Sequence, residues 1–283
     1  MKIAISCETT VDVTKDLISK YNLHIVPFTI VLGNEQKLDG DITPEEIFSF
    51  VKETGKLPKT SAVNQFQYEE HFENILKEYD AIIHLTLSSL MSSAYQNAVE
   101  ASKKYQNVKV IDSKTLSTGI ALLALYAKEL VDANHTLDEI VKKVQNRIPS
   151  NQASFILENV DFLYKGGRCS VLSYIGANLL SLKPQIIVKN GKMVAGKKFR
   201  GKFSKCVKQY VEHTLEQFNN PDKTRVFLTY TTADQETLDY ITKRLYEVGF
   251  KEVLLTTAGG TISSHCGPHC LGILYFNDGG ENK

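Results

Sequence analysis

Three short segments rich in hydroxyl and imidazole groups are the parts of this 283-residue chain best suited to chemistry. Residues 59–61 are Lys-Thr-Ser, residues 87–93 hold four serines, and residues 264–268 are Ser-His-Cys-Gly-Pro. Each follows or precedes an apolar run typical of a strand. Hydroxyls, an imidazole and backbone N–H groups at strand ends can hold a small anion. No partner carboxylate or metal-ligand cluster accompanies them, so they make a weak case for covalent catalysis.

The serine-rich segment gives the clearest signal of the three. Ser88, Ser89, Ser92 and Ser93 lie between a predicted strand and a predicted helix, where backbone N–H groups favour an anion. Ordinary helix capping needs one or two serines rather than four, so we favour anion binding over capping. The segment lacks the Gly-x-Ser-x-Gly pattern, which counts against an esterase.

Three other groups leave more than one interpretation open. Thr60 and Ser61 precede a helix-like segment, so they fit a helix cap and a ligand contact equally well. His265 lies in His-Cys-Gly-Pro-His-Cys, but no second Cys or His pair completes a zinc site, and we interpret it as part of a loop over a ligand. Arg168 follows two glycines and fits either an anionic ligand or a structural carboxylate partner.

The charge distribution supports an anionic partner. The net charge is only +1, yet eleven Lys and Arg residues and no acidic residue lie between Asp161 and Glu212. The rest of the chain has 22 basic and 32 acidic residues. Such a window suggests a phosphate, a nucleotide, a lipid headgroup or an acidic protein surface. A solvated basic face is the alternative.

Composition limits the class of protein. Five scattered cysteines are an odd number, which argues against a disulfide framework and fits a reducing cytoplasm. No apolar run is long enough for a membrane-spanning helix, and the apolar N-terminal stretch is too short for a signal peptide. No Gly-x-Gly-x-x-Gly occurs, so we expect no nicotinamide cofactor, and we expect no metal. We therefore expect a cytoplasmic protein. We expect it to be a monomer because no heptad pattern or exposed apolar stripe is evident.

The elements that must position these groups alternate between strands and helices in the first half. We expect strands at residues 2–7, 81–87 and 108–112, each followed by a helix. Thr43 and Pro44 open a helix with a capping box, and Gly55 fits its end. This order predicts a Rossmann-like, three-layer α/β domain with a parallel sheet over residues 1–149. Ligands bind such sheets at the carboxyl ends of the strands, where the serine-rich segment would lie.

The second half has a different pattern. Pro149 marks the expected boundary. Asn190-Gly191 predicts a hairpin between two strands, and helices are expected over residues 204–218 and 234–248. A hairpin among helices predicts an α+β domain with a mixed sheet over residues 150–283.

Taken together, these motifs resemble the DegV family of bacterial fatty-acid-binding proteins. The resemblance covers essentially the whole chain, and its specificity comes from the order of the pieces. The matching pieces are residues 9–12, Lys59-Thr60-Ser61, residues 87–96, residues 110–114, residues 163–168, Leu182-Lys183-Pro184, Gly191-Lys192 with Arg200-Gly201, and His265 with Gly267-Pro268.

The resemblance implies a two-domain protein, without catalytic activity of its own, that binds one fatty acid of about C14–C18. It implies that the protein presents the acyl carboxylate to a separate fatty-acid kinase, which forms an acyl phosphate. The tail would lie in an apolar slot of the second domain. Transient contact with a membrane surface fits this role, whereas nucleic acid does not. The implied carboxylate-binding residues are Thr60, Ser61, Ser92, Ser93 and His265, and those facing the headgroup side or the kinase are Arg168 and Arg200.

The chain departs from the family pattern around the headgroup. Ala62-Val63 replaces Gln-Pro, Leu90 and Ser93 replace glycines, and His269 replaces a glycine. These bulkier residues put the carboxylate contacts and the chain-length preference in question. A rival interpretation is a Ser/His-dependent hydrolase or phosphotransferase, which would need a carboxylate that orients His265. A nucleic-acid binder ranks last because few aromatic residues interleave the basic window.

Overall fold

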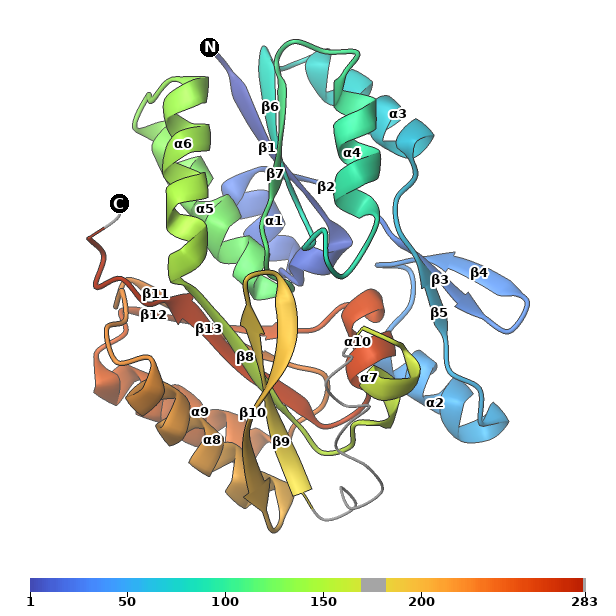
Figure 1. Ribbon diagram of the computed structural model, residues 1–283, viewed down its shortest axis with the longest axis vertical. Coiled ribbons are helices and arrows are strands. Elements are labelled where there is room, and N and C mark those ends of the chain that lie inside the picture. The colour runs from blue at the N-terminus through green and yellow to red at the C-terminus, as the bar shows by residue number, and fades with distance from the viewer. Residues whose placement is uncertain (169–181, 282–283) are drawn as a thin grey trace.

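The computed structural model describes residues 1–168 and 182–281, and its elements build three sheets (Figure 1). The first sheet has four parallel strands in the order β2-β1-β6-β7. Its two central strands are buried along their whole length, as expected for parallel strands covered on both faces. The four strands are β1 (Ile3–Glu8), β2 (Leu23–Val26), β6 (Ala81–Thr86) and β7 (Val108–Asp112).

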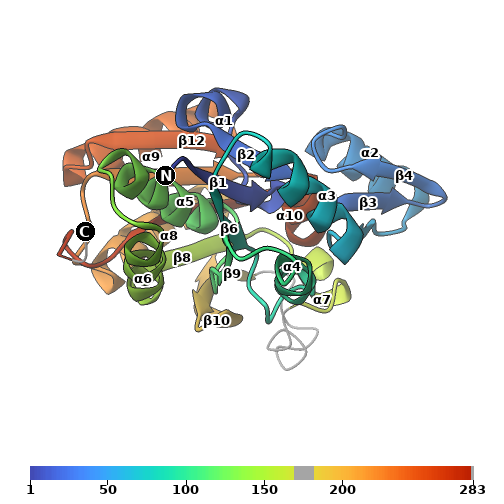
Figure 2. The same ribbon diagram turned by 90° about the horizontal axis from the view of Figure 1, so that it is seen from above.

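Helices cover both faces of this parallel sheet. Helices α3 (Gln65–Leu76) and α4 (Ala94–Ser102) pack on one face, and α5 (Thr118–Asp132) and α6 (Leu137–Arg147) pack on the other (Figures 1 and 2). Helix α1 (Lys15–Tyr21) leads from β1 to β2. The three-layer α/β arrangement predicted for the first half is therefore confirmed.

The second sheet is mixed and has six strands in the order β10-β9-β8-β13-β11-β12. Only β11 and β12 pair in parallel. Helices α8 (Phe203–Gln217) and α9 (Gln235–Val248) pack against it, which confirms the predicted α+β class. The strands are β8 (Asn151–Leu157), β9 (Leu182–Lys189), β10 (Lys192–Arg200), β11 (Arg225–Tyr230), β12 (Glu252–Thr257) and β13 (Cys270–Phe276).

The predicted hairpin joins β9 and β10. Asn190 and Gly191 both have positive φ, of 51° and 81°, as a two-residue type I′ turn requires. Exposed basic residues from the stretch between Asp161 and Glu212, which has no acidic residue, cluster on this hairpin. Strand β10 is an edge strand, where lysines discourage pairing with another chain. These exposed residues are Lys189, Lys192, Lys197, Lys198 and Arg200.

Helix α5 joins the two sheets. It packs against β1 and β6 of the parallel sheet and against β8 and β13 of the mixed sheet. Eleven of its fifteen residues are buried, so it is apolar around its circumference like other central helices. The predicted boundary between residues 149 and 150 falls between the strands of the two sheets, but one apolar core extends across it. The division into two domains therefore stays a prediction.

A small third sheet forms a lobe on one side of the molecule (Figure 1). It consists of β3 (Thr29–Leu32), β4 (Glu35–Leu38) and β5 (Lys59–Ser61), and it is accompanied by α2 (Pro44–Thr54). The predicted capping box of α2 is present, and Gly55 ends the helix with a left-handed φ of 68°. Thr60 and Ser61 thus belong to a strand rather than to a helix cap.

Two short helices complete the fold. Helix α10 (Gly260–Cys266) packs against α2, β3 and β5, and α7 (Asp161–Lys165) packs against α10.

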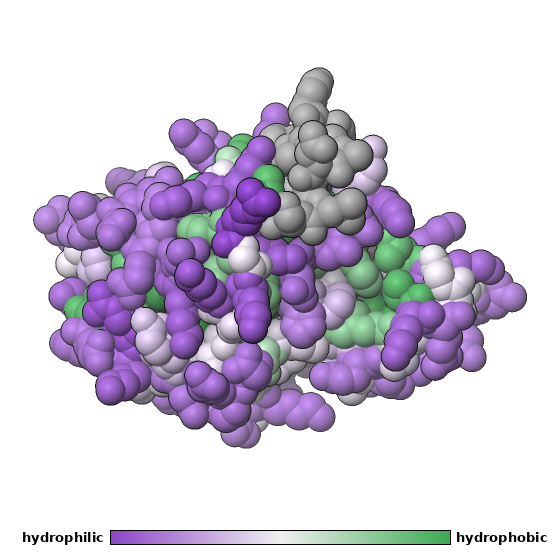
Figure 3. Space-filling model, turned by 90° about the horizontal axis from the view of Figure 1, so that it is seen from below, coloured by the Kyte–Doolittle hydropathy of each residue, from purple (hydrophilic) through white to green (hydrophobic). Residues whose placement is uncertain are grey.

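The four described cysteines, Cys266 among them, are all buried and free, and Cys169 lies outside the described residues. Hydrophilic residues cover most of the face seen from below, and hydrophobic residues gather toward the lobe of α2 (Figure 3). No helix in the described ranges has the length and apolarity needed to cross a bilayer.

Candidate binding site

Five of the seven predicted site residues line one cavity. This cavity, of about 190 Å³, lies among β5, residues 87–93, α7 and α10. Ser61 and Arg200 are exposed and do not belong to its lining. Successive side chains of a strand point to opposite sides, which explains why Thr60 lines the cavity and Ser61 does not. The predicted residues that line it are Thr60, Ser92, Ser93, Arg168 and His265.

Thr60 and His265 form the polar contact at the centre of this lining. His265 Nε2 lies 2.9 Å from Thr60 Oγ1, although the two residues are 205 positions apart. Burial, and secondarily the charge of Arg168, lower the pKa of His265 to about 4. The imidazole is therefore neutral at pH 7 and can act as a hydrogen-bond donor on one nitrogen. Its Nδ1 is buried and makes no hydrogen bond with any described residue.

The chain around His265 is packed too closely for larger residues. A Cβ on Gly166 would lie 2.6 Å from His265 Nδ1, so this glycine allows α7 to approach the imidazole. His265 itself lies in the last turn of α10, and the prediction that it belongs to a loop is wrong. A seven-residue helix has too few turns for a recognisable apolar period.

Two carboxylates from the first half of the chain hold the start of α10. Asp12 accepts the N–H of Gly259 at 2.8 Å and the hydroxyl of Ser117 at 2.5 Å. Asp39 accepts the N–H groups of Gly260 and Thr261 at 2.8 and 3.1 Å. Burial raises the pKa of Asp12 to about 8, against the lowering effect of these hydrogen bonds. These contacts fix the helix that carries His265.

The four serines predicted to bind an anion have different roles. Ser88 donates to the carbonyl of Gly191 at 2.8 Å and so joins the serine-rich loop to the β9–β10 hairpin. Ser89 donates to Asp112 Oδ2 at 2.5 Å, and its backbone N–H reaches Oδ1 of the same side chain. The other two serines of the loop, at positions 92 and 93, line the cavity. Two of the four are therefore structural.

A second, smaller cavity with an apolar lining adjoins the main one. A smaller cavity of about 30 Å³ shares Leu116, Ile262 and Cys266 with the main one. Its far end is lined by Phe155 and Leu274 from the mixed sheet. The main cavity therefore has hydroxyls and an imidazole in its lining, and the small cavity beside it is mostly apolar and includes residues of the mixed sheet. The sequence did not indicate these apolar lining residues because they follow the same periodic pattern as core residues.

The arrangement does not resemble a catalytic triad. A Ser/His hydrolase needs a carboxylate hydrogen-bonded to the imidazole. In the described part of the chain, no Asp or Glu forms an ion pair or hydrogen bond with His265, whose only recorded partner is Thr60. Among the described residues, the site therefore shows groups that can hold and orient a ligand.

Comparisons with known proteins identify the family of this chain. A family model described as "Uncharacterised protein, DegV family" matches residues 2–278. A fatty acid-binding protein of Thermotoga maritima is 30% identical over 281 residues, which cover 96% of each chain. A solved structure described as fatty acid binding of a DegV family protein from Thermus thermophilus has a TM-score of 0.90 at 25% identity, covering 98% of this chain and 99% of that chain. A DegV lipid-binding protein of Thermotoga maritima has a TM-score of 0.85 at 28% identity, covering 98% of both. Because the family model spans nearly the whole chain, this protein belongs to the DegV family.

Proposed function

We propose that this protein binds one long-chain fatty acid in the cavity between β5, residues 87–93 and α10, without catalysing a reaction. The observation that carries the proposal is a hydroxyl-lined cavity that shares three lining residues with an adjoining apolar cavity. A carboxylate with a long hydrocarbon tail matches both parts. The two relatives and the Thermus structure named above, which are described as binding fatty acids or lipid, support it.

The headgroup would lie against Thr60, Ser92, Ser93 and His265. Hydroxyl groups and a neutral imidazole N–H can donate to a carboxylate, and such charge-assisted bonds are stronger than neutral ones. Arg168, on the cavity lining but exposed, supplies a positive charge at the mouth. Ser61 lies outside the lining, so its role in the headgroup site depends on a movement of β5.

The tail would supply most of the affinity. Burying a methylene contributes about 0.8 kcal/mol, and the gross sum over a chain of about C14–C18 exceeds what association costs remove. The hydroxyls then need only orient the carboxylate. The acyl-chain length that we propose, about C14–C18, is the one that the family resemblance implies.

We further propose that the protein is a cytoplasmic monomer that presents its ligand to a separate fatty-acid kinase. The support is electrostatic, because the exposed basic residues of the β9–β10 hairpin, Arg200 among them, would attract an acidic protein face or the phosphates of ATP. The same residues would allow a transient contact with an anionic membrane surface.

The test is a binding titration with cis-parinarate, a fluorescent C18 fatty acid. Thr60→Val keeps the shape of the side chain and removes its hydroxyl, so we expect Kd to rise about fivefold to tenfold, the effect of one lost hydrogen bond. Thr54→Val, on the exposed end of α2, is the matched control and should leave Kd unchanged. Wild-type protein that binds no fatty acid after delipidation would overturn the proposal.

A further inference from the structure

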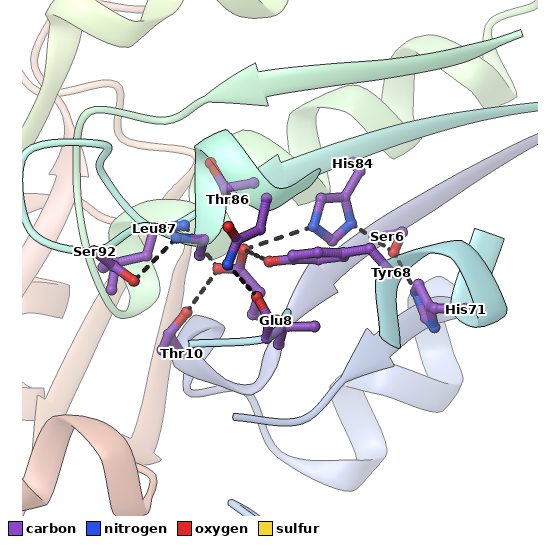
Figure 4. Close-up of polar contacts among 12 residues, drawn as sticks. Ser6, Glu8, Thr10, Tyr68, His71, His84, Thr86, Leu87 and Ser92 are labelled. Atoms are coloured by element: carbon purple, nitrogen blue, oxygen red, sulfur yellow. Dashed lines mark hydrogen bonds and ion pairs between the residues drawn. The ribbon is translucent and has the colours of Figure 1, made fainter. Parts of the chain in front are cut away.

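A wholly buried carboxylate lies behind the serine-rich loop. Glu8 Oε2 accepts the N–H of Leu87 at 2.7 Å and the hydroxyl of Thr10 at 3.2 Å, and Oε1 accepts the hydroxyl of Tyr68 at 2.6 Å (Figure 4). Leu87 lines the cavity and begins the loop that carries Ser92. No described Lys or Arg forms an ion pair with Glu8, so its hydrogen-bond donors are a backbone N–H and two hydroxyls.

Glu8 also connects the loop to the segments on either side of it. Thr10 follows β1, and the neighbouring Thr9 accepts the N–H of Phe28, another lining residue, at 3.1 Å. Tyr68 lies on α3, which follows the strand that carries Thr60. Of the three groups that donate to Glu8, Leu87 lines the cavity, and Thr10 and Tyr68 lie on segments next to other lining residues.

A chain of polar groups leads from Glu8 to the opposite surface. His84 Nδ1 lies 2.9 Å from Ser6 Oγ, whereas His84 Nε2 lies 3.6 Å from Glu8 Oε1, longer than a hydrogen bond, and has no hydrogen-bond partner among the described residues. Ser6 Oγ lies 2.8 Å from His71 Nε2. His71 lines an outer cavity of about 380 Å³, while Ser6 and His84 are wholly buried. Figure 4 shows these groups in one row from the serine-rich loop to His71.

The single hydroxyl proton of Ser6 ties the two imidazoles together. If Ser6 donates to His84 Nδ1, then His71 must donate through Nε2–H, and His84 carries its proton on Nε2, facing an ionised Glu8. If Ser6 donates to His71, then His84 carries its proton on Nδ1 and presents a lone pair to Glu8, which pairs only with a protonated carboxyl. The two arrangements differ by one proton on Glu8.

A proton can pass between these arrangements along the chain. A hydronium ion in the outer cavity protonates His71 Nδ1 and is left as water, His71 Nε2–H passes to Ser6, the Ser6 proton passes to His84 Nδ1, and His84 Nε2–H passes to Glu8 when the 3.6 Å separation shortens to a hydrogen bond. Each ring ends as the other neutral tautomer, and one proton has moved from solvent to Glu8. Burial, helped by the nearby imidazoles, lowers the pKa of His71 to about 3, so the His71 ring is neutral at pH 7.

We propose that Glu8 is a positioning residue for the serine-rich loop and that it exchanges its proton with solvent through His84, Ser6 and His71. The inference rests on the proposed function only in taking residues 87–93 as a ligand-binding loop. Burial and the charge of Glu8 raise the pKa of Tyr68, which keeps this phenol a donor. The groups that face the chain from the packed elements are Cys7, Thr10, His24, Tyr68, Glu78 and Tyr79.

The test uses histidine-selective ¹⁵N labelling and NMR of the imidazole rings at pH 7. Wild-type His84 should carry its proton on Nε2, and Glu8→Gln, a neutral mimic, should move it to Nδ1 and shift His71 to the other tautomer as well. In the double variant Glu8→Gln, Ser6→Ala, the His71 ring should keep the tautomer that it has in the wild type. Tyr68→Phe is the matched control: it removes a donor to Glu8 but keeps its charge, and His84 should keep its Nε2 proton.

Binding of cis-parinarate gives the second readout. Glu8→Gln should raise Kd about tenfold by loosening Leu87, and Glu8→Asp should restore part of the loss. If His84 keeps the same tautomer in Glu8→Gln as in the wild type, the proton path is overturned. If Glu8→Gln does not fold, a proton on Nδ1 of His84 in the wild type would overturn it instead. A tautomer change with unaltered Kd would overturn the positioning role. Wild-type protein that binds no fatty acid but shows the tautomer change refutes only the proposed function.

Discussion

At the scale of single residues, the meeting of Thr60 and His265 defines the candidate headgroup site. The sequence singled out both residues, and their hydroxyl and imidazole types predicted a ligand contact. It could not show that they touch each other, because the 2.9 Å contact joins positions 205 residues apart. The buried Glu8 gave no signal at all, since a lone carboxylate at the end of a strand is typical of surface residues.

The neutral state of His265 leads to a proton-linkage prediction. In the free protein, burial and Arg168 hold its pKa at about 4. A fatty-acid carboxylate beside the ring favours the imidazolium and must raise that pKa. The fatty acid itself loses protons when it binds as a carboxylate near pH 5, so the comparison is between variants. We expect the wild type to take up more protons, or to release fewer, than His265→Gln, as measured by calorimetry in buffers of different ionisation enthalpy. Equal proton changes in the two proteins would contradict the assignment.

At the scale of elements, the position of α10 depends on hydrogen bonds rather than on its own sequence. Seven residues including two central serines and one glycine form a weak helix, and periodicity could not predict it. The carboxylates of Asp12 and Asp39 satisfy three of its first N–H groups. By contrast, α2 was predictable because Thr43, Pro44 and Gly55 mark both its ends.

This anchor gives a prediction about stability and binding together. Asp39→Asn replaces one of the two carboxylate oxygens that accept N–H groups from α10 with a donor, at a position that is 3% exposed. We expect the free energy of unfolding to fall by about 2 kcal/mol and the affinity for fatty acid to fall with it. Urea unfolding and cis-parinarate titration measure the two effects. Asp41→Asn, an exposed neighbour, is the control, and equal losses in both variants would argue against the anchor.

At the scale of the whole molecule, the fold class was predictable and the packing of the halves was not. Alternating strands and helices predicted the parallel sheet, and Asn190-Gly191 predicted the hairpin of the mixed sheet. No local pattern shows that α5 packs between the two sheets, because an apolar helix fits any buried position. Nor could the sequence place the third sheet, whose strands are only three or four residues long.

Buried histidines should make the fold sensitive to acid. The folded-state pKa is about 3 for His71 and about 4 for His265, both below the usual 6.5 because burial disfavours the charged ring. The unfolded chain therefore binds these protons first, and stability is lost as pH falls from about 6.5 toward these values. Asp12, whose folded-state pKa is raised to about 8, acts in the opposite direction, because its contribution to the stability of the fold is lost as pH rises from about 4 to 8.

Thermal unfolding between pH 4 and 7 separates these contributions. We expect His71→Gln to show a shallower fall of Tm with acidification than the wild type, since it lacks one of the groups that take up a proton on unfolding. Parallel curves for the two proteins would show that His71 is not the source of the acid sensitivity.

The most direct test of the central claim is native mass spectrometry of the freshly purified protein, followed by denaturing extraction and lipid analysis. The proposed function predicts one fatty acid of about C14–C18 per chain, released on unfolding and absent from a Thr60→Val, His265→Gln double variant or reduced in it. A chain that is empty as purified and that takes up no added fatty acid after delipidation would contradict the claim, and would indicate that the cavity holds a different small anion.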